Sequence, residues 1–129
     1  MYDQPGPLEQ LTTVATFLRD QVVPRLDGQL AFHARVAANM LDIVARQIDL
    51  GPAAERDELA RLLGLLGHGG TLDELNRDLC QAIANGTIGA QTPGLTEHLW
   101  RVALDKLAVD QPRYDTRLRL LADDTNLDA

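Results

Sequence analysis

The chain has 129 residues, 45% of them hydrophobic, and a formal net charge of −7 at pH 7. This length suits one domain with its own core, and the negative charge repels phosphate backbones, which disfavours nucleic-acid binding. No apolar run reaches the roughly 18 residues that a membrane span needs, and the N-terminus lacks the features of a secretory signal. We therefore expect a cytoplasmic protein that binds neither nucleic acid nor membranes.

The first predicted helix covers residues 8–23 and ends before Pro24. Hydrophobic residues recur at intervals of three and four along it, at Leu8, Leu11, Ala15, Leu18 and Val22. This spacing places them on one side of a helix. A short link follows, and short links favour antiparallel neighbours, so we expect this helix to pack on the next one.

The second predicted helix, residues 30–50, is so apolar that it should lie in the middle of a bundle. Its hydrophobic side chains cover well over half of the circumference and leave only a narrow polar slice, which carries Arg35, Asn39, Asp42, Arg46 and Asp49. We therefore predict that this helix is central and largely buried. Gly51 and Pro52 then predict its end and the first turn of the next helix.

Three further helices are predicted after Gly51. The first covers about residues 53–66; the second follows Thr71 and Glu74, which have the form of a capping box; the third runs from Thr92-Pro93 to about Val109. No alternating run is long enough for a strand. We predict a single all-α domain, a bundle of about five helices over residues 1–129, with its core at about 8–114 and a weakly structured tail at 115–129.

His33 is the main candidate for unusual chemistry, because it lies on the apolar side of helix 30–50 and should be buried. A buried histidine can act as a general base with a perturbed pKa, but it more often serves as a core or interface residue holding one hydrogen bond. His68 and His98 lack the spacing of a metal site, and Cys80, without a CxxC partner, should be a small core residue. We expect no catalytic residue, metal or cofactor.

Two groups of residues are candidate partner-binding sites. The first is the polar slice of helix 30–50, with Arg35, Asn39 and Arg46; its alternative is a solvated, ion-paired helix face. The second follows the last helix and contains Asp110, Arg113 and Tyr114. Arginine and tyrosine are enriched among interface hot spots, but this corner suits equally well a structural latch against the helix. The sequence also leaves open whether the chain forms a homo-oligomer.

Two segments, AFHARVAAN at residues 31–39 and LDKLAVDQPRY at residues 104–114, resemble a family of small bacterial proteins of unassigned function. The similarity spans about residues 8–114. By this resemblance, members look like companions of aminoglycoside-phosphotransferase-like kinases, typically encoded beside such a kinase and an acyl-CoA dehydrogenase. The resemblance implies a non-catalytic subunit of a kinase that phosphorylates hydroxyacyl-CoA during hydroxy-acid breakdown. The alternatives are a helical acyl-CoA-binding module and a small stand-alone enzyme using His33.

Overall fold

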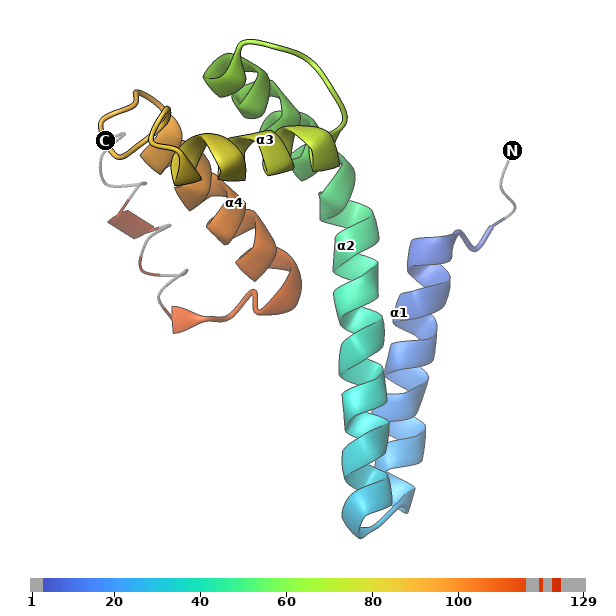
Figure 1. The fold of residues 1–129 in the computed structure, drawn as a ribbon. Helices are drawn as coiled ribbons and strands as arrows, with labels where there is room; N and C mark the ends of the chain where they lie inside the picture. The colour runs from blue at the N-terminus through green and yellow to red at the C-terminus, as the bar shows by residue number, and fades with distance from the viewer. Residues whose placement is uncertain (1–3, 116–118, 120–121, 124–129) are drawn as a thin grey trace. The chain divides into compact units, whose positions relative to one another are not determined.

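A computed structural model describes residues 4–115, 119 and 122–123, and within this part of the chain the regular structure is entirely helical. The prediction of an all-α protein is therefore confirmed. The tail predicted at 115–129 falls largely outside the described residues. None of the helices in the described part is long and apolar enough to span a membrane. The α-helices are α1 (Pro7–Phe17), α2 (Gly28–Leu66), α3 (Leu72–Ala84) and α4 (Leu95–Asp110) (Figure 1).

The structure has four α-helices in its described part where five were predicted, because α2 continues through Gly51 and Pro52. Proline lacks the N–H that would bond to the carbonyl four residues earlier, so it usually marks a helix end or a kink. The dihedral angle that proline fixes is nevertheless a helical one, and the good helix formers Ala53, Ala54 and Glu55 follow it, although Gly51 before it is a poor one. The two predicted helices are thus parts of one 39-residue helix.

Backbone contacts divide the chain into two compact units, Met1–Gly51 and Pro52–Ala129. The boundary falls at the proline inside α2, so each unit contains one part of that helix. The single-domain organisation expected from the chain length stays a prediction.

The first unit is a helical hairpin of α1 and the first part of α2 (Figure 1). After Phe17, α1 continues as a π-helical segment, η1 (Leu18–Val22), and a 3₁₀ turn, η2 (Val23–Arg25), before α2 begins at Gly28. The antiparallel packing predicted from the short link is confirmed.

Alanines form the buried centre of this hairpin. Its buried residues are Ala15 of α1 and Ala31, Ala38 and Ala45 of α2. The three alanines of α2 are seven residues apart and therefore lie on one side of the helix. Because a methyl group is small, helices that meet at alanine can approach closely.

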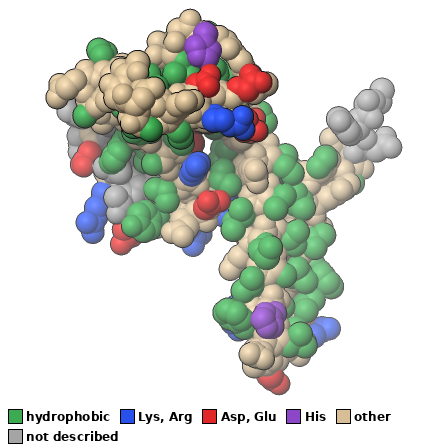
Figure 2. Space-filling view, viewed as in Figure 1, with side chains coloured by type: hydrophobic (Ala, Val, Ile, Leu, Met, Phe, Trp, Pro, Cys, Tyr) green, Lys and Arg blue, Asp and Glu red, His purple; other side chains and the backbone are tan. Residues whose placement is uncertain are grey.

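The prediction that helix 30–50 is largely buried is wrong. Its large hydrophobic side chains are mostly exposed, with Leu30 and Met40 both 61% exposed and Phe32 57% exposed. The physical reason is that α1 covers only the alanine side of this helix, and a two-helix hairpin has no third element to cover the other sides. Figure 2 shows hydrophobic side chains gathered over the surface of the hairpin.

The second unit has a core of leucine and isoleucine side chains contributed by α2, α3, α4 and the loop before α4. These residues are Leu62, Leu75, Leu79, Ile88 and Leu95. Leu62 and Leu75 are almost fully buried, at 0% and 1% exposure. This cluster holds the three helical segments of the unit together.

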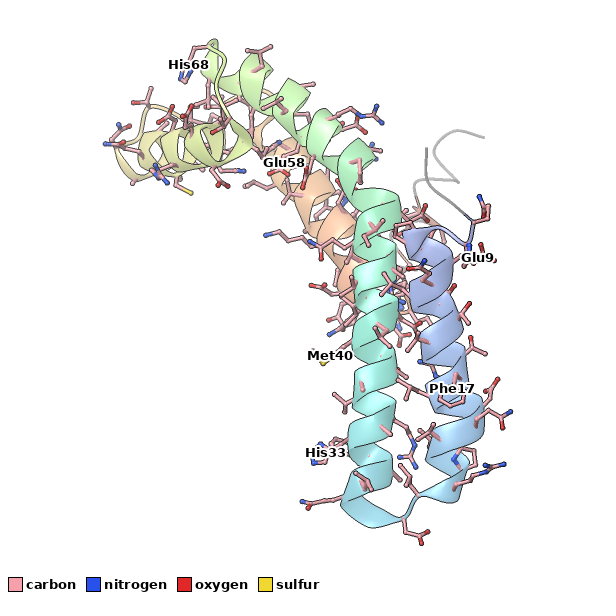
Figure 3. The ribbon with its side chains drawn as sticks, turned by 90° about the vertical axis from the view of Figure 1, so that its right-hand side faces the viewer. Glu9, Phe17, His33, Met40, Glu58 and His68 are labelled. Atoms are coloured by element: carbon pink, nitrogen blue, oxygen red, sulfur yellow. The ribbon has the colours of Figure 1, made fainter. Side chains whose placement is uncertain are left out.

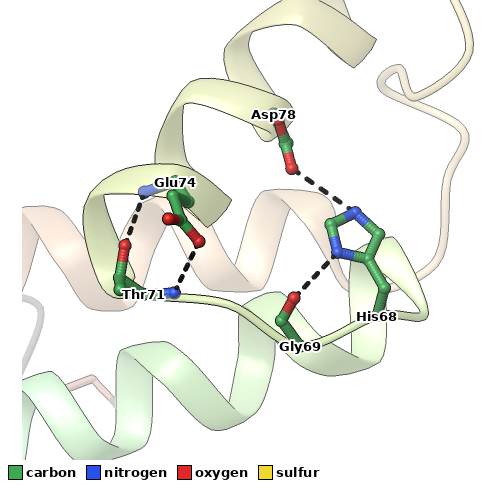
Figure 4. A network of polar contacts seen from close by, with 5 residues as sticks. All are labelled: His68, Gly69, Thr71, Glu74 and Asp78. Atoms are coloured by element: carbon green, nitrogen blue, oxygen red, sulfur yellow. Dashed lines mark hydrogen bonds and ion pairs between the residues drawn. The ribbon is translucent and has the colours of Figure 1, made fainter.

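The predicted capping box of α3 is confirmed (Figure 4). The Glu74 N–H donates to Thr71 Oγ1 over 3.2 Å, and the Thr71 N–H donates to Glu74 Oε2 over 3.1 Å. The predicted start of the last helix at Thr92-Pro93 is wrong by two residues, because Gly94, with a φ of 90°, is the N-cap of α4. Cys80 is exposed rather than in the core.

Candidate partner-binding surface

Arg19 crosses the hairpin and contacts the polar slice of α2. Its Nη2 atom donates to Asn39 Oδ1 over 3.1 Å and to Asp42 Oδ2 over 2.8 Å. The Arg19 and Asp42 side chains are 42% and 31% exposed, so this ion pair contributes little to stability. It links Asn39 and Asp42 at the surface through one shared donor group.

Arg35, Asn39 and Arg46 lie on the same side of α2, since residues four, seven and eleven apart share a helix face. Arg35 and Asn39 are exposed, whereas Arg46 is partly buried. We call Arg35, Asn39, Asp42 and Arg46, with Arg19 beside them, the polar strip. Sequence reasoning found its members on α2 but missed Arg19, which no periodic signal connects to them.

The second predicted group follows the C-terminal end of α4. Asp110 is the last residue of that helix, and the Gln111 N–H caps it by donating to the Leu107 carbonyl over 2.8 Å. The Tyr114 N–H then donates to the Gln111 carbonyl over 3.0 Å, which closes a turn. Tyr114 is 48% exposed and Arg113 is exposed. Both predicted roles, docking corner and latch, stay predictions.

The two groups belong to different units, because the polar strip lies within Met1–Gly51 and Asp110, Arg113 and Tyr114 lie within Pro52–Ala129. Within the first group, the Arg19 contacts bring Asn39 and Asp42 together.

His33 is exposed, so the prediction that it is buried is wrong. Its ring meets the Phe32 ring edge-on, with the ring centroids 5.7 Å apart. Figure 3 shows His33 and Met40 on the side of α2 that points away from α1. The argument for a buried general base at this position is therefore removed.

The buried histidine of the described residues is His98 in α4, which is 1% exposed. Arg61 Nε of α2 donates to His98 Nδ1 over 3.1 Å. A guanidinium group has no acceptor, so Nδ1 must be unprotonated and the neutral ring carries its proton on Nε2. Burial lowers the pKa of His98 below its ordinary value, the Arg61 charge lowers it further, and Glu58 opposes both effects.

The polar groups around His98 come from three helices. Glu58 Oε1 of α2 accepts from Asn76 Nδ2 of α3 over 3.0 Å. Arg61 Nη2 is buried and has no hydrogen-bond partner among the described residues. Sequence reasoning missed this cluster, although His98 occupies a position of the buried stripe of α4, three residues after Leu95.

The lowered pKa of His98 predicts that acid destabilises the fold. Above the ordinary histidine pKa of about 6.5, the ring is neutral in both the folded and the unfolded chain. Below it the unfolded chain takes up the proton first, so stability is lost as the pH falls. We expect the thermal midpoint to fall between about pH 7.5 and pH 5.5, and to fall less in His98→Gln, which keeps an acceptor for Arg61 but does not titrate. The thermal midpoints are measured by circular dichroism. An equal fall of the midpoint in the unmodified chain and in His98→Gln would mean that groups other than His98 cause the effect.

His68 has a local role in the turn before α3. His68 Nε2 lies 3.5 Å from Asp78 Oδ2, with both side chains about half exposed, and its Nδ1 atom lies 3.2 Å from the Gly69 carbonyl oxygen (Figure 4). Within the described ranges, no group of three or more His, Cys, Asp and Glu residues is placed to hold a metal ion.

The fold and this surface define a small all-α protein whose N-terminal hairpin presents an ordered polar strip on one side and exposed hydrophobic side chains on another. The family model described as "Domain of unknown function (DUF6285)" matches residues 24–114. The chain belongs to this family. The comparison with curated proteins found no match, and neither did the comparison with solved structures.

Proposed function

We propose that this protein is a non-catalytic companion subunit of an aminoglycoside-phosphotransferase-like kinase that acts on hydroxyacyl-CoA in hydroxy-acid breakdown. The kinase and its substrate come from the family resemblance of the sequence. The structural observation behind the proposal is the polar strip, in which Arg19 donates hydrogen bonds to Asn39 and Asp42.

An ordered polar strip suits a docking role for an energetic reason. Immobilising a flexible side chain on binding costs roughly 0.5–1.5 kcal/mol, and contacts formed before binding reduce that cost. Arg35 adds an exposed guanidinium, a group that recognises carboxylates with two parallel hydrogen bonds. The strip therefore favours an acidic, hydrogen-bonding patch on the kinase.

The division of labour also fits the chemistry of phosphoryl transfer. That reaction depends on carboxylate-held Mg²⁺ and on cations around the nucleotide phosphates, which a kinase of this class supplies by itself. In the proposed assembly the companion contributes binding surface, and the kinase contributes the reacting groups.

Charge reversal of Arg35 tests the proposal. We expect Arg35→Glu to weaken association with the neighbouring kinase by about 2 kcal/mol, as loss of a hot spot does, while the melting temperature changes little because the residue is exposed. Arg56→Glu is the matched control, since Arg56 is another exposed arginine of α2 but lies in the other unit. The measurements are a titration of each variant with the kinase and a thermal melt.

The possible results separate the proposals. Undiminished binding by Arg35→Glu would remove the polar strip from the interface, and absence of any kinase binding by the unmodified chain would overturn the companion role.

Arg113→Glu in the same titration tests the corner after α4: weaker binding at an unchanged melting temperature supports docking, and a lower melting temperature supports the latch. Saturable stabilisation by acyl-CoA alone would indicate a binding module instead.

A further inference from the structure

The hairpin has a second surface, on the side of α2 that points away from α1. Five hydrophobic residues spaced four apart form a row along it: Phe32, Val36, Met40, Val44 and Ile48. Their exposed fractions run from 37% at Val36 to 61% at Met40. We call these five residues the open apolar face.

The open apolar face is comparable in area with the largest apolar patch of a typical monomer. A large side chain offers roughly 150–200 Å² when fully exposed, so the exposed fractions of these five residues give an area on the order of 400 Å². The largest apolar patch on a typical monomer is about 300–600 Å², and each partner in a stable complex contributes about 800 Å². The five residues thus supply about half of what one partner of a dimer needs, and the smaller side chains between them add to that area.

The face also carries no charged residue. On a helical projection, the positions between and beside the row are occupied by alanine, isoleucine, glutamine and His33, and the arginines and aspartates of this part of α2 fall on the other sides. This face offers no charged group that could pair with a charged partner surface. A surface of the same apolar kind would match it.

We propose that the open apolar face joins two copies of this chain in a two-fold symmetric dimer. Such a contact uses the same patch on both copies, so the patch must be self-complementary, and an uncharged row meets that condition without placing like charges opposite each other. The hairpin also contributes little to long-range repulsion between copies. It has four arginines against six acidic residues, a net −2 of the −7 carried by the whole chain.

The dimer would leave the polar strip accessible. The strip and the open apolar face occupy different sides of α2, since Asn39 is one position away from Met40 and therefore about 100° around the helix. A dimer could thus present two polar strips to kinase subunits. The self-association itself does not depend on the proposed kinase, and it is tested without it.

The test is the mass of the full chain in solution, measured by sedimentation equilibrium over a range of concentrations. We expect the unmodified protein to be a dimer at micromolar concentrations and Met40→Asp to raise the dissociation constant at least hundredfold, because an unpaired carboxylate would be buried in the contact. Leu63→Asp is the matched control: Leu63 is a similarly exposed hydrophobic residue of α2, 49% exposed, but outside the face. Circular dichroism verifies that both variants keep their helices.

Three results would overturn the proposal. One is a monomeric unmodified protein throughout the concentration range. Another is a Met40→Asp variant that dimerises as tightly as the unmodified chain, and a third is equal weakening by Leu63→Asp. If the unmodified chain is monomeric and Met40→Asp abolishes kinase binding, the face belongs to the kinase contact instead.

Discussion

Leu62→Ala is expected to lower the free energy of unfolding by about 3 kcal/mol, because removing a large buried side chain loses its burial and leaves a cavity. Leu62 is 0% exposed and belongs to the core cluster that also contains Leu75 and Leu95, so neighbours from α3 and α4 would lose contacts together. The change should be visible in urea unfolding followed by the fluorescence of Trp100, the single tryptophan of the chain, which lies in the same unit.

The adjacent leucine provides the control for that experiment. Leu63 is 49% exposed, so Leu63→Ala removes the same atoms from a site that is already half in water. We expect a change of less than about 1 kcal/mol, since exposed substitutions have small effects and alanine favours a helix. Similar losses at both positions would contradict the core assignment.

Ala15→Leu is expected to destabilise the hairpin by about 3 kcal/mol, because a leucine cannot fit where two helices meet through alanine. Ala15 is 1% exposed, and the other buried residues of this unit are alanines of α2. The added side chain must either push the helices apart or adopt a strained rotamer. Hydrogen exchange of the α1 amides and thermal melts would both report the loss.

Thr16→Leu is the matched control, because Thr16 is the next residue of α1 and is exposed. It introduces the same leucine side chain without placing it between the two helices. Leucine favours a helix slightly more than threonine does, so we expect the free energy of unfolding to change by less than about 1 kcal/mol. A loss at position 15 no greater than the loss at position 16 would mean that α1 does not approach α2 as closely as the structure has it.

Periodicity and capping chemistry explain which parts of the fold could be predicted. The spacing of Leu72, Leu75 and Leu79 together with the Thr71–Glu74 box defines α3, because both signals are local and chemically specific. The break predicted at Gly51-Pro52 was wrong because proline is compatible with a helix as well as with its first turn. The choice between these outcomes depends on the flanking residues rather than on the proline.

The candidate site was harder to predict, because hydrophobicity does not reveal what covers a helix. The apolar circumference of helix 30–50 was interpreted as burial within the chain, whereas the structure covers only the side with Ala31, Ala38 and Ala45. The same assumption placed His33 in the core. His98 has fewer hydrophobic neighbours in sequence, and its burial depends on Arg61, 37 residues away, which no local pattern indicates.

The two sides of α2 repeat with different periods, and this sets how each can pack. The buried alanines recur every seven residues, the spacing of helices that run nearly side by side at about 20°. The open apolar face is instead a ridge of residues four apart, and two such ridges interdigitate when their helices cross at about 50° in the opposite sense. A second copy of α2 on this face would therefore cross the first obliquely. In a two-fold pair the crossing point falls at the middle of the ridge, where Met40 of one copy meets Met40 of the other.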